Sequence, residues 1–462
     1  MSRVFQELTD AFLLLDLQRH VDSIPNEMRI LVIGSGGREH ALLWSLKKNA
    51  AKPLDLFCAP GNAGIAQIAE CLPVSATDIA TMRELAIDRE IDLVIVGPEA
   101  PLAAGIVDDF EREGLRIVGP RKAAARLEAS KAFAKEFMRR HGIPTAPFRV
   151  ATSREEAIEI LRSGEFGDKD TPVVVKADGL AAGKGVVVAK SRALAERAVD
   201  DLFGGAVSPE ACDRLIIEAA LNGLEASLLL FSDGKDFRLM PAARDHKRVG
   251  DNDTGPNTGG MGSITNADVL DTATLERVVK EIVEPTLNGA RSDGFPFRGT
   301  LFIGLMLTAE GPQVLEYNVR FGDPEAQAIL VRLQTDLVEI FEAIANQRLA
   351  ETEVRWSNQS SVCVVLAAKG YPSKPVTGDR IFGLDKIEPD ERIALFHAAT
   401  SRGANGEWLT AGGRVLGVTA TGTNLNAALE RAYGAVQKIR WDGMHCRRDI
   451  GRSLAAEGTA GR

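Results

Sequence analysis

The sequence has few cysteines, few aromatic residues and no excess of basic charge, and each shortage excludes a class of protein. Five scattered cysteines without a C-x-x-C pair argue against a disulfide framework or a zinc site and fit buried thiols in a reducing compartment, the cytoplasm. No apolar run approaches the roughly 18 residues of a membrane span. A net charge of −9 argues against a general nucleic-acid surface.

What the chain does contain is typical of a globular protein with several domains: 462 residues, 45% hydrophobic and 26% charged. Residues 1–27 carry an amphipathic stretch without the basic start and unbroken apolar centre of a secretory signal. Met28 is followed at once by a clean strand. We therefore expect residues 1–27 to be a loosely attached N-terminal extension whose deletion leaves activity intact.

Residues 28–128 alternate strand-like and helical segments, which predicts a parallel sheet wrapped by helices. The predicted strands are Ile30–Ile33, Leu54–Cys58, Leu93–Val96 and Arg116–Val118. In such sheets ligands bind beyond the carboxyl ends of the strands. The turns that follow the first three strands there, rich in glycine and proline, are therefore candidates for substrate binding.

The first glycine loop, Gly34–His40, follows a strand and opens a helix, an arrangement that favours a phosphate group. It is not a G-x-G-x-x-G motif, because Glu39 occupies the place of the third glycine. The strand that ends at Cys58 also lacks the acid that binds a ribose 2′-hydroxyl. These features argue against a nicotinamide-dependent dehydrogenase and favour a phosphate-bearing small molecule, although a purely structural turn is the alternative.

The pattern changes near Ser130. A predicted helix, Lys131–His141, leads into β-rich sequence through about Leu333. Val173–Val188 is predicted to form strand, glycine-rich loop and strand, with Lys176 inside the first apolar strand. A buried ammonium needs an anionic partner, and a lysine beside a loop of N–H groups suits a triphosphate. Lys131 is a plausible second phosphate contact, and a solvated surface charge is the alternative for a single lysine.

A further predicted strand, Val314–Arg320, alternates strictly between polar and apolar side chains from Leu315 onward. Period two places Glu316, Asn318 and Arg320 on one face. A carboxylate with an amide is an oxygen-only pair that suits Mg²⁺ bridging ATP phosphates, and Arg320 could neutralise charge on a transferring phosphoryl group. A solvated sheet edge is the alternative, which the apolar neighbours disfavour.

Five motifs occur together and in order along the chain. They are Gly36–Leu42, Ala59–Gly64, Val96–Leu102, Asp245–Gly262 and Arg320–Glu325. Through them the chain, from Met28 to about Gly451, resembles the phosphoribosylamine–glycine ligases of the ATP-grasp superfamily. The resemblance implies an α/β protein with three parts: a parallel-sheet domain at 28–128, an ATP-grasp α+β domain at 129–336 with a mobile lid at about 145–217, and a small α+β domain at 355–455.

The resemblance also implies a reaction. ATP, with Mg²⁺ or Mn²⁺, would join glycine to 5-phosphoribosylamine in purine synthesis, through glycyl phosphate and without a covalent protein nucleophile. The partners are then small molecules, with no nucleic acid and no membrane, and we expect a monomer. One alternative is an ATP-grasp ligase acting on another ribonucleotide intermediate. A catalytically silent nucleotide-binding protein is a second, which the intact Lys176 and Glu316 disfavour.

Finally, the resemblance assigns residues. The ATP phosphates are expected at Lys131, Lys176, Gly183, Lys184 and Gly185. The adenine hinge and ribose are expected at Glu218 and Glu225. The metal ligands are expected to be Glu316 and Asn318. The acyl phosphate and glycine are expected at Arg320, Asp245, Thr258, Gly259 and Gly260. The phosphoribosyl group is expected at Gly36, Gly37, Arg38, Asn62 and Glu99.

Overall fold

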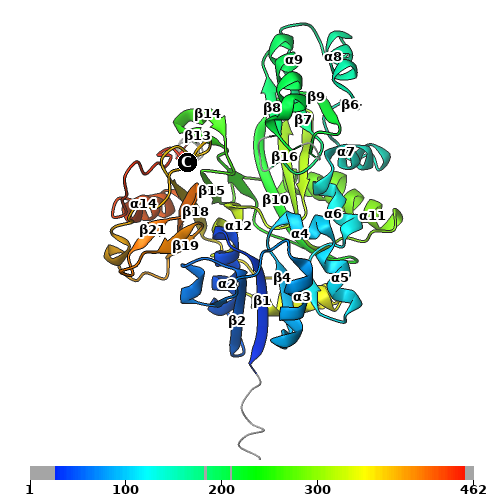
Figure 1. Ribbon diagram of the computed structural model, residues 1–462. Helices are drawn as coiled ribbons and strands as arrows, with labels where there is room; N and C mark the ends of the chain where they lie inside the picture. The colour runs from blue at the N-terminus through cyan, green and yellow to red at the C-terminus, as the bar shows by residue number, and fades with distance from the viewer. Residues whose placement is uncertain (1–26, 182–184, 209–210, 453–462) are drawn as a thin grey trace, which may run out of the picture.

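The computed structural model describes residues 27–181, 185–208 and 211–452, and its elements are labelled in Figure 1. The predictions for Gly183, for Lys184 and for nearly all of the N-terminal extension lie outside these residues. Within the described part of the chain no helix is long and apolar enough to cross a membrane. All five cysteines are free thiols.

The N-terminal domain is the predicted parallel sheet, with strand order β3-β2-β1-β4-β5. Its strands are β1 (Met28–Gly34), β2 (Leu54–Pro60), β3 (Glu70–Cys71), β4 (Leu93–Val96) and β5 (Ile117–Val118). Its helices are α2 (Gly37–Lys48), α3 (Ile79–Asp88), α4 (Glu99–Ala104), α5 (Ile106–Arg112) and α6 (Lys122–Ala129). The two-residue β3 carries too short a pattern to be foreseen.

A small antiparallel sheet, order β6-β9-β7-β8, projects at the top of Figure 1 with its own apolar cluster. Its strands are β6 (Phe148–Ala151), β7 (Val173–Ala177), β8 (Val186–Ala189) and β9 (Leu215–Ala219), covered by α8 (Arg154–Arg162) and α9 (Arg192–Asp201). The hydroxyls of Ser153 and Ser191 cap these two helices. This unit spans the residues expected to form a lid, whose movement stays a prediction.

The largest sheet has nine strands and runs β17-β16-β10-β12-β15-β18-β22-β19, with β11 paired to β10. Its first strands are β10 (Leu224–Asp233), β11 (Phe237–Leu239), β12 (Ala243–Asp245), β15 (Gly262–Thr265), β16 (Arg298–Thr308) and β17 (Gly311–Asn318). The C-terminal ones are β18 (Ser360–Ala367), β19 (Ile393–His397) and β22 (Arg414–Gly422), with α14 (Leu425–Val436) beside them. The pairing of β15 with β18 makes one continuous sheet, which the sequence did not indicate.

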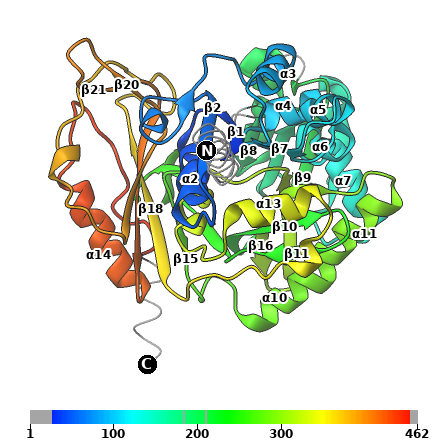
Figure 2. The same cartoon turned by 90° about the horizontal axis from the view of Figure 1, so that it is seen from below.

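Helices and short hairpins cover these sheets. The helices are α7 (Lys131–Arg140), α10 (Thr272–Val278), α11 (Glu284–Ser292), α12 (Glu325–Leu330) and α13 (Leu337–Ala345). The hairpin strands are β13 (Arg248–Gly250) with β14 (Thr254–Asn257), and β20 (Thr400–Arg402) with β21 (Trp408–Thr410). Seen from below, α2 lies between the N-terminal sheet and the C-terminal strands (Figure 2).

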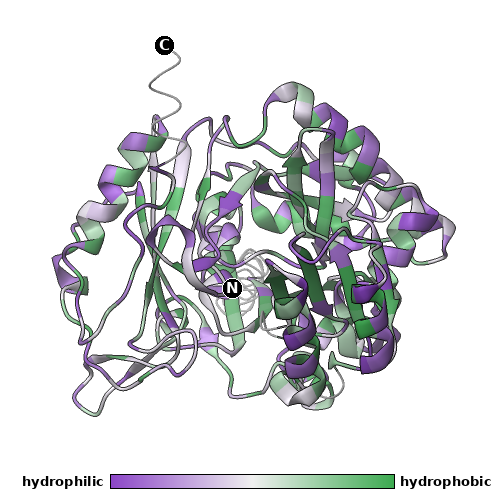
Figure 3. Ribbon diagram, turned by 90° about the horizontal axis from the view of Figure 1, so that it is seen from above, coloured by the Kyte–Doolittle hydropathy of each residue, from purple (hydrophilic) through white to green (hydrophobic). Residues whose placement is uncertain are grey.

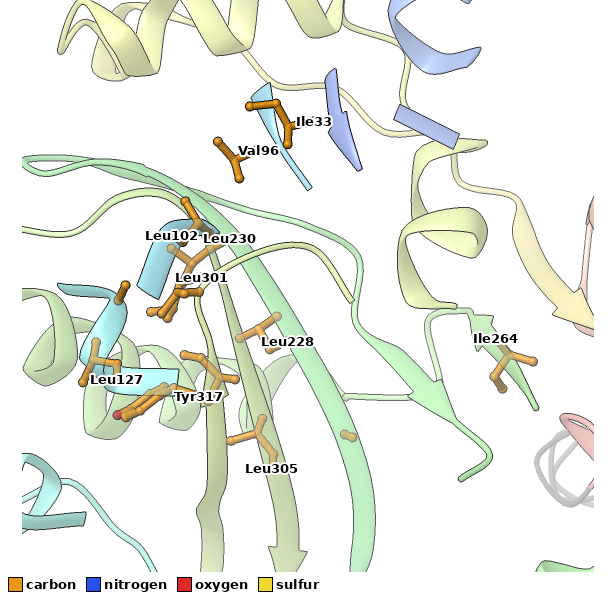
Figure 4. Close-up of a cluster of buried hydrophobic side chains, with 14 of the residues drawn as sticks. Ile33, Val96, Leu102, Leu127, Leu228, Leu230, Ile264, Leu301, Leu305 and Tyr317 are labelled. Atoms are coloured by element: carbon orange, nitrogen blue, oxygen red, sulfur yellow. The ribbon is translucent and has the colours of Figure 1, made fainter. Parts of the chain in front are cut away.

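Strand β10 shows how the core is organised, because its period of two sends side chains to both faces of the large sheet. Leu228 and Leu230 join one buried cluster, which Figure 4 shows reaching Ile33 and Val96 of the N-terminal domain. Leu229 and Phe231 join a second buried cluster. Figure 3 shows the apolar strands inside and helices with mixed faces outside. The sheet is thus buried on both sides, which fixes its strands as supports for a site.

Phe341→Ala tests this second cluster. Phe341 is fully buried and packs edge-on against Phe231 and Phe321, so we expect its truncation to lower the free energy of unfolding by about 3–5 kcal/mol. Urea titration followed by circular dichroism measures the loss. Val376→Ala, at an exposed position, should change it by less than about 0.5 kcal/mol; equal effects of the two variants would contradict the assignment.

Candidate functional site

One cavity of about 530 Å³ gathers most of the predicted site residues from the N-terminal and ATP-grasp parts of the chain, and Arg414 of the C-terminal part joins them. Those that line it are Arg38, Glu99, Lys131, Lys176, Gly185, Asp245, Thr258, Gly259, Glu316, Asn318 and Arg320. The other described ones, Gly36, Gly37, Asn62, Glu218, Glu225 and Gly260, do not line it. Residues more than 200 positions apart therefore meet at one place, as a site of chemistry requires.

The glycine-rich loop after β7 is anchored to the start of α7 by Asp178. Its carboxylate accepts hydrogen bonds from the Ser130 hydroxyl (2.9 Å) and the Ala132 N–H (2.7 Å), and it pairs with Arg214. The Lys131 ammonium donates to the Gly179 carbonyl at 3.0 Å. These bonds place Lys131 and the loop on the same side of the cavity, where both can face one polyphosphate.

Glu218, expected at the adenine hinge, pairs with two lysines in the structure, and its contact with a nucleotide stays a prediction. Its carboxylate is buried and forms ion pairs with both Lys135 and Lys176. Burial would raise the pKa of Glu218, but the two ammonium groups outweigh it and the pKa is lowered. Burial lowers the pKa of Lys135 to about 8. Glu218 therefore holds two cations at the cavity wall instead of lining it.

Strand β17 presents the oxygen ligands. A bulge at Leu315 interrupts its pairing with β16, and the Leu315 carbonyl accepts a hydrogen bond from the Lys176 ammonium at 3.2 Å. Beyond it Glu316, Asn318 and the mostly buried Tyr317 line the cavity, while Val319 is buried and does not line it. Burial would raise the pKa of Glu316, but Lys247, Lys176 and Lys131 lower it overall, so the carboxylate is ionised. An ionised carboxylate beside an amide oxygen fits a hard divalent cation.

Arg320 is held in place by two acids. Its guanidinium pairs with Glu128 at 2.8 Å and Glu99 at 3.2 Å, and also donates to Asn318 Oδ1 at 3.3 Å. Glu128 is buried and also accepts the Val319 N–H at 2.7 Å. The arginine thus reaches the cavity from a rigid base next to the expected metal ligands.

Lys247 is a cationic residue of the cavity that the sequence analysis did not single out. Its ammonium pairs with Glu225 at 2.7 Å, so Glu225 supports a lysine at the cavity and does not line the cavity itself. Burial would lower the pKa of Lys247, but Glu225 and Glu316 outweigh it and raise the pKa. The sequence could have pointed to Lys247, because it lies inside the Asp245–Gly262 motif.

A group of carboxylates occupies the end of the cavity next to the C-terminal strands. Burial, reinforced by the charge of Glu325, raises the pKa of Asp245 well above its usual value, and burial also raises that of Glu325. Asp323 pairs with Arg414 at 3.1 Å, and Arg414 also donates to the Gly259 carbonyl at 2.6 Å. Two carboxyl groups with raised pKa values keep a proton at higher pH than ordinary carboxyl groups do.

The C-terminal segment fastens the base of the Asp245–Gly262 loop. Arg447 is almost fully buried and pairs with Asp253 and Asp449. The Gly451 N–H donates to His246 Nε2 at 3.1 Å, and His246 Nδ1 lies 3.3 Å from the Gly262 carbonyl. The loop residues that face the cavity therefore project from a base fixed at several points.

The first glycine loop is filled by Glu39, and this changes the expected phosphoribosyl contacts. The Glu39 carboxylate accepts the Gly36 N–H (2.6 Å) and pairs with Arg38 (2.6 Å), and a Cβ at Gly97 would overlap it. Arg38 alone of Gly36–Arg38 lines the cavity. The side-chain amide of Asn62 donates hydrogen bonds to the carbonyls of Ser35 (2.7 Å) and His397 (2.9 Å).

Lysines beside a glycine-rich loop, an ionised carboxylate with an amide, and a clamped arginine on a mixed sheet define an ATP-grasp enzyme. The biotin carboxylase domain of Hydrogenobacter thermophilus 2-oxoglutarate carboxylase, solved with MgADP, shares this fold at 17% identity and TM-score 0.69, covering 90% of this chain and 91% of that one.

Family models then match the chain in order: phosphoribosylglycinamide synthetase N domain at residues 28–128, its ATP-grasp (A) domain at 129–326 and its C domain at 361–453. The chain belongs to the phosphoribosylamine–glycine ligase family. The ligase of Xanthomonas axonopodis pv. citri is 48% identical over 93% of this chain and 99% of that one. The crystal structure of the Thermotoga maritima ligase has TM-score 0.79 and 34% identity, covering 92% and 100%.

His246 makes the loop base sensitive to acid. Burial lowers its pKa from 6.5 to about 4, so the unfolded chain binds the proton more readily between these values. The free energy of unfolding should therefore decrease as the pH falls through this window. Urea titrations from about pH 7.5 to about pH 4.5 should show a smaller decrease for His246→Gln, which does not titrate; identical slopes would contradict the role of His246.

Proposed function

We propose that the chain joins glycine to 5-phospho-D-ribosylamine at the expense of ATP, giving glycinamide ribonucleotide, ADP and phosphate. Family membership and the meeting of Lys176, Glu316 and Arg320 at one cavity support this reaction. The lining cations suit a triphosphate, and the mixed acidic and basic end near Asp245 and Arg414 suits an amino acid and an amine. The expected cytoplasmic location and the monomeric state stay predictions.

In the first step, a carboxylate oxygen of glycine attacks the γ-phosphorus of ATP, and the bond from that phosphorus to the ADP oxygen breaks. Lys131 and Lys176 neutralise the phosphate charge, and Arg320, held by Glu128 and Glu99, steadies the phosphoryl group as it passes. Glu316 and Asn318 would hold a divalent cation, magnesium or manganese, which would supply further positive charge for phosphoryl transfer. Fixed cations of this kind are ready before charge develops, so little reorganisation is needed.

In the second step, the ribosylamine nitrogen attacks the carbonyl carbon of glycyl phosphate. A C–N bond forms, the C–O bond to phosphate breaks, and the nitrogen loses a proton. The carboxyl pair of Asp245 and Glu325 is placed to accept that proton, because burial raises both pKa values. Arg38 on α2 and the Thr258–Gly259 segment bound the space left for the ribosyl phosphate and glycine.

Omission of single substrates tests the reaction. Phosphate release from ATP with Mg²⁺ should require both glycine and phosphoribosylamine, and mass spectrometry should identify glycinamide ribonucleotide. Turnover that does not depend on glycine, or that proceeds with bicarbonate in its place, would keep the fold and overturn the substrate assignment.

Glu316→Gln tests the cation site within this proposal. The change removes the negative charge that faces Lys131, Lys176 and Lys247, so we expect kcat/KM to fall at least about 10-fold and the required Mg²⁺ concentration to rise. Initial rates over a Mg²⁺ titration measure both effects. The matched control is Glu310→Gln, an exposed acid in the turn before the same strand; equal rates for the two variants would count against a metal role.

A further inference from the structure

A second cavity, of about 760 Å³, lies between the N-terminal domain and the C-terminal strands and contains none of the predicted catalytic residues. His40 of α2 and His397 of β19 line it together with Trp408 of β21 and the segment Arg380–Lys386. Its size is in the range of small-molecule sites. The first turn of α2 borders both cavities, since Arg38 lines the catalytic one and His40 the second.

Two of the sequence motifs contribute to this cavity: Gly36–Leu42 supplies His40, and Ala59–Gly64 contacts His397. Asn62, which the catalytic cavity leaves out, bonds the His397 carbonyl, and a Cβ at Gly64 would overlap the His397 ring. Gln67 and Ile68, just beyond that motif, line the wall. Asn62 and Gly64 of this motif therefore hold His397 in its place in the wall of the second cavity.

The inner wall is a row of planar groups with fixed orientation. His40 lies 5.6 Å from His397, and the His397 ring lies 4.5 Å from Trp408, centroid to centroid. His40 Nδ1 accepts the His397 N–H at 2.9 Å, so in the neutral ring its Nε2 carries the hydrogen. Within the described residues no acceptor is found for this Nε2–H. Both imidazoles are buried. Because His40 also lines the cavity, its Nε2–H is available to a bound molecule.

The rest of the lining is cationic and apolar. The side chains of Arg380, Lys386 and Arg440 have no ion pair or hydrogen bond with any described residue. The two guanidinium groups lie 5.0 and 5.5 Å from the ring centre of Phe382, which is 41% exposed. Asp385 and Glu407 also line the cavity, but Glu407 already accepts the Asn405 N–H at 2.9 Å. These three cationic side chains, unpaired within the described residues, lie beside the exposed ring of Phe382. Such a lining is suited to an anion that also carries a planar ring.

We propose that this cavity binds a small organic anion that combines a planar ring with a phosphate group, which is the chemistry of a nucleoside monophosphate. Arg380, Lys386 and Arg440 bind the phosphate, and the ring packs against Phe382 and the His397–Trp408 wall. The site is separate from that of the proposed ligase reaction, and its existence does not depend on that reaction.

The test is calorimetric titration of adenosine 5′-monophosphate into the full chain carrying Lys131→Ala, which removes an ammonium group that lines the catalytic cavity and lies outside the buried Glu218 cluster. We expect the monophosphate to bind, and adenosine or inorganic phosphate alone to bind at least about 10-fold more weakly. Adding Arg380→Ala and Arg440→Ala should weaken binding at least about 10-fold. The matched control Arg392→Ala, whose guanidinium pairs with Asp390 outside the cavity, should have no effect.

Three results would overturn the proposal: no binding of the monophosphate to the Lys131→Ala protein, binding unchanged by the paired arginine substitutions, or phosphate alone binding as tightly as the nucleotide. The protein with Arg380→Ala and Arg440→Ala should keep the circular dichroism spectrum and the urea unfolding midpoint of the natural chain, which shows that it is folded. Because the readout is binding, failure of the ligase assay would leave this test unaffected.

Discussion

The ion pairs of Glu218 with Lys135 and Lys176 connect three elements, β9, α7 and β7, and the Lys176 bond to the Leu315 carbonyl adds β17. Removing one charge from such a buried group leaves the others uncompensated, which costs several kcal/mol. The small sheet, the start of the glycine-rich loop and the strand with the oxygen ligands are therefore placed relative to one another by this one cluster. The geometry of the cavity depends on it.

The same balance of charge prepares the cavity for its substrates. Lys131, Lys176 and Lys247 surround Glu316 and keep it ionised, so cations are already assembled where a polyphosphate brings negative charge. At the other end, Asp245 and Glu325 lie close enough to raise the pKa of Asp245. One cavity thus has an electropositive part and a part whose carboxyl groups have raised pKa values, and both are set by buried neighbours.

The parts of this site that sequence predicts are those with a local pattern. Alternation in β17 identified Glu316 and Asn318, and an apolar strand with one lysine identified Lys176. Partners across the fold have no such signature. Nothing near Arg414 indicates that it reaches Asp323, and nothing near Glu218 indicates that its carboxylate faces two lysines. The contact of Asn62 with the His397 carbonyl is equally invisible in the sequence, since a turn that follows a strand can bond to a distant chain segment as readily as to a ligand.

The continuous sheet has a consequence for association between molecules. Strand β15 pairs with β12 on one side and with β18 on the other, so the C-terminal strands cover what would otherwise be an open edge of the ATP-grasp sheet. An uncovered edge of unpaired N–H and C=O groups is a template for strand addition from another chain. The C-terminal strands therefore move this edge of the sheet from β15 to β19, in addition to the residues that they bring to the cavity.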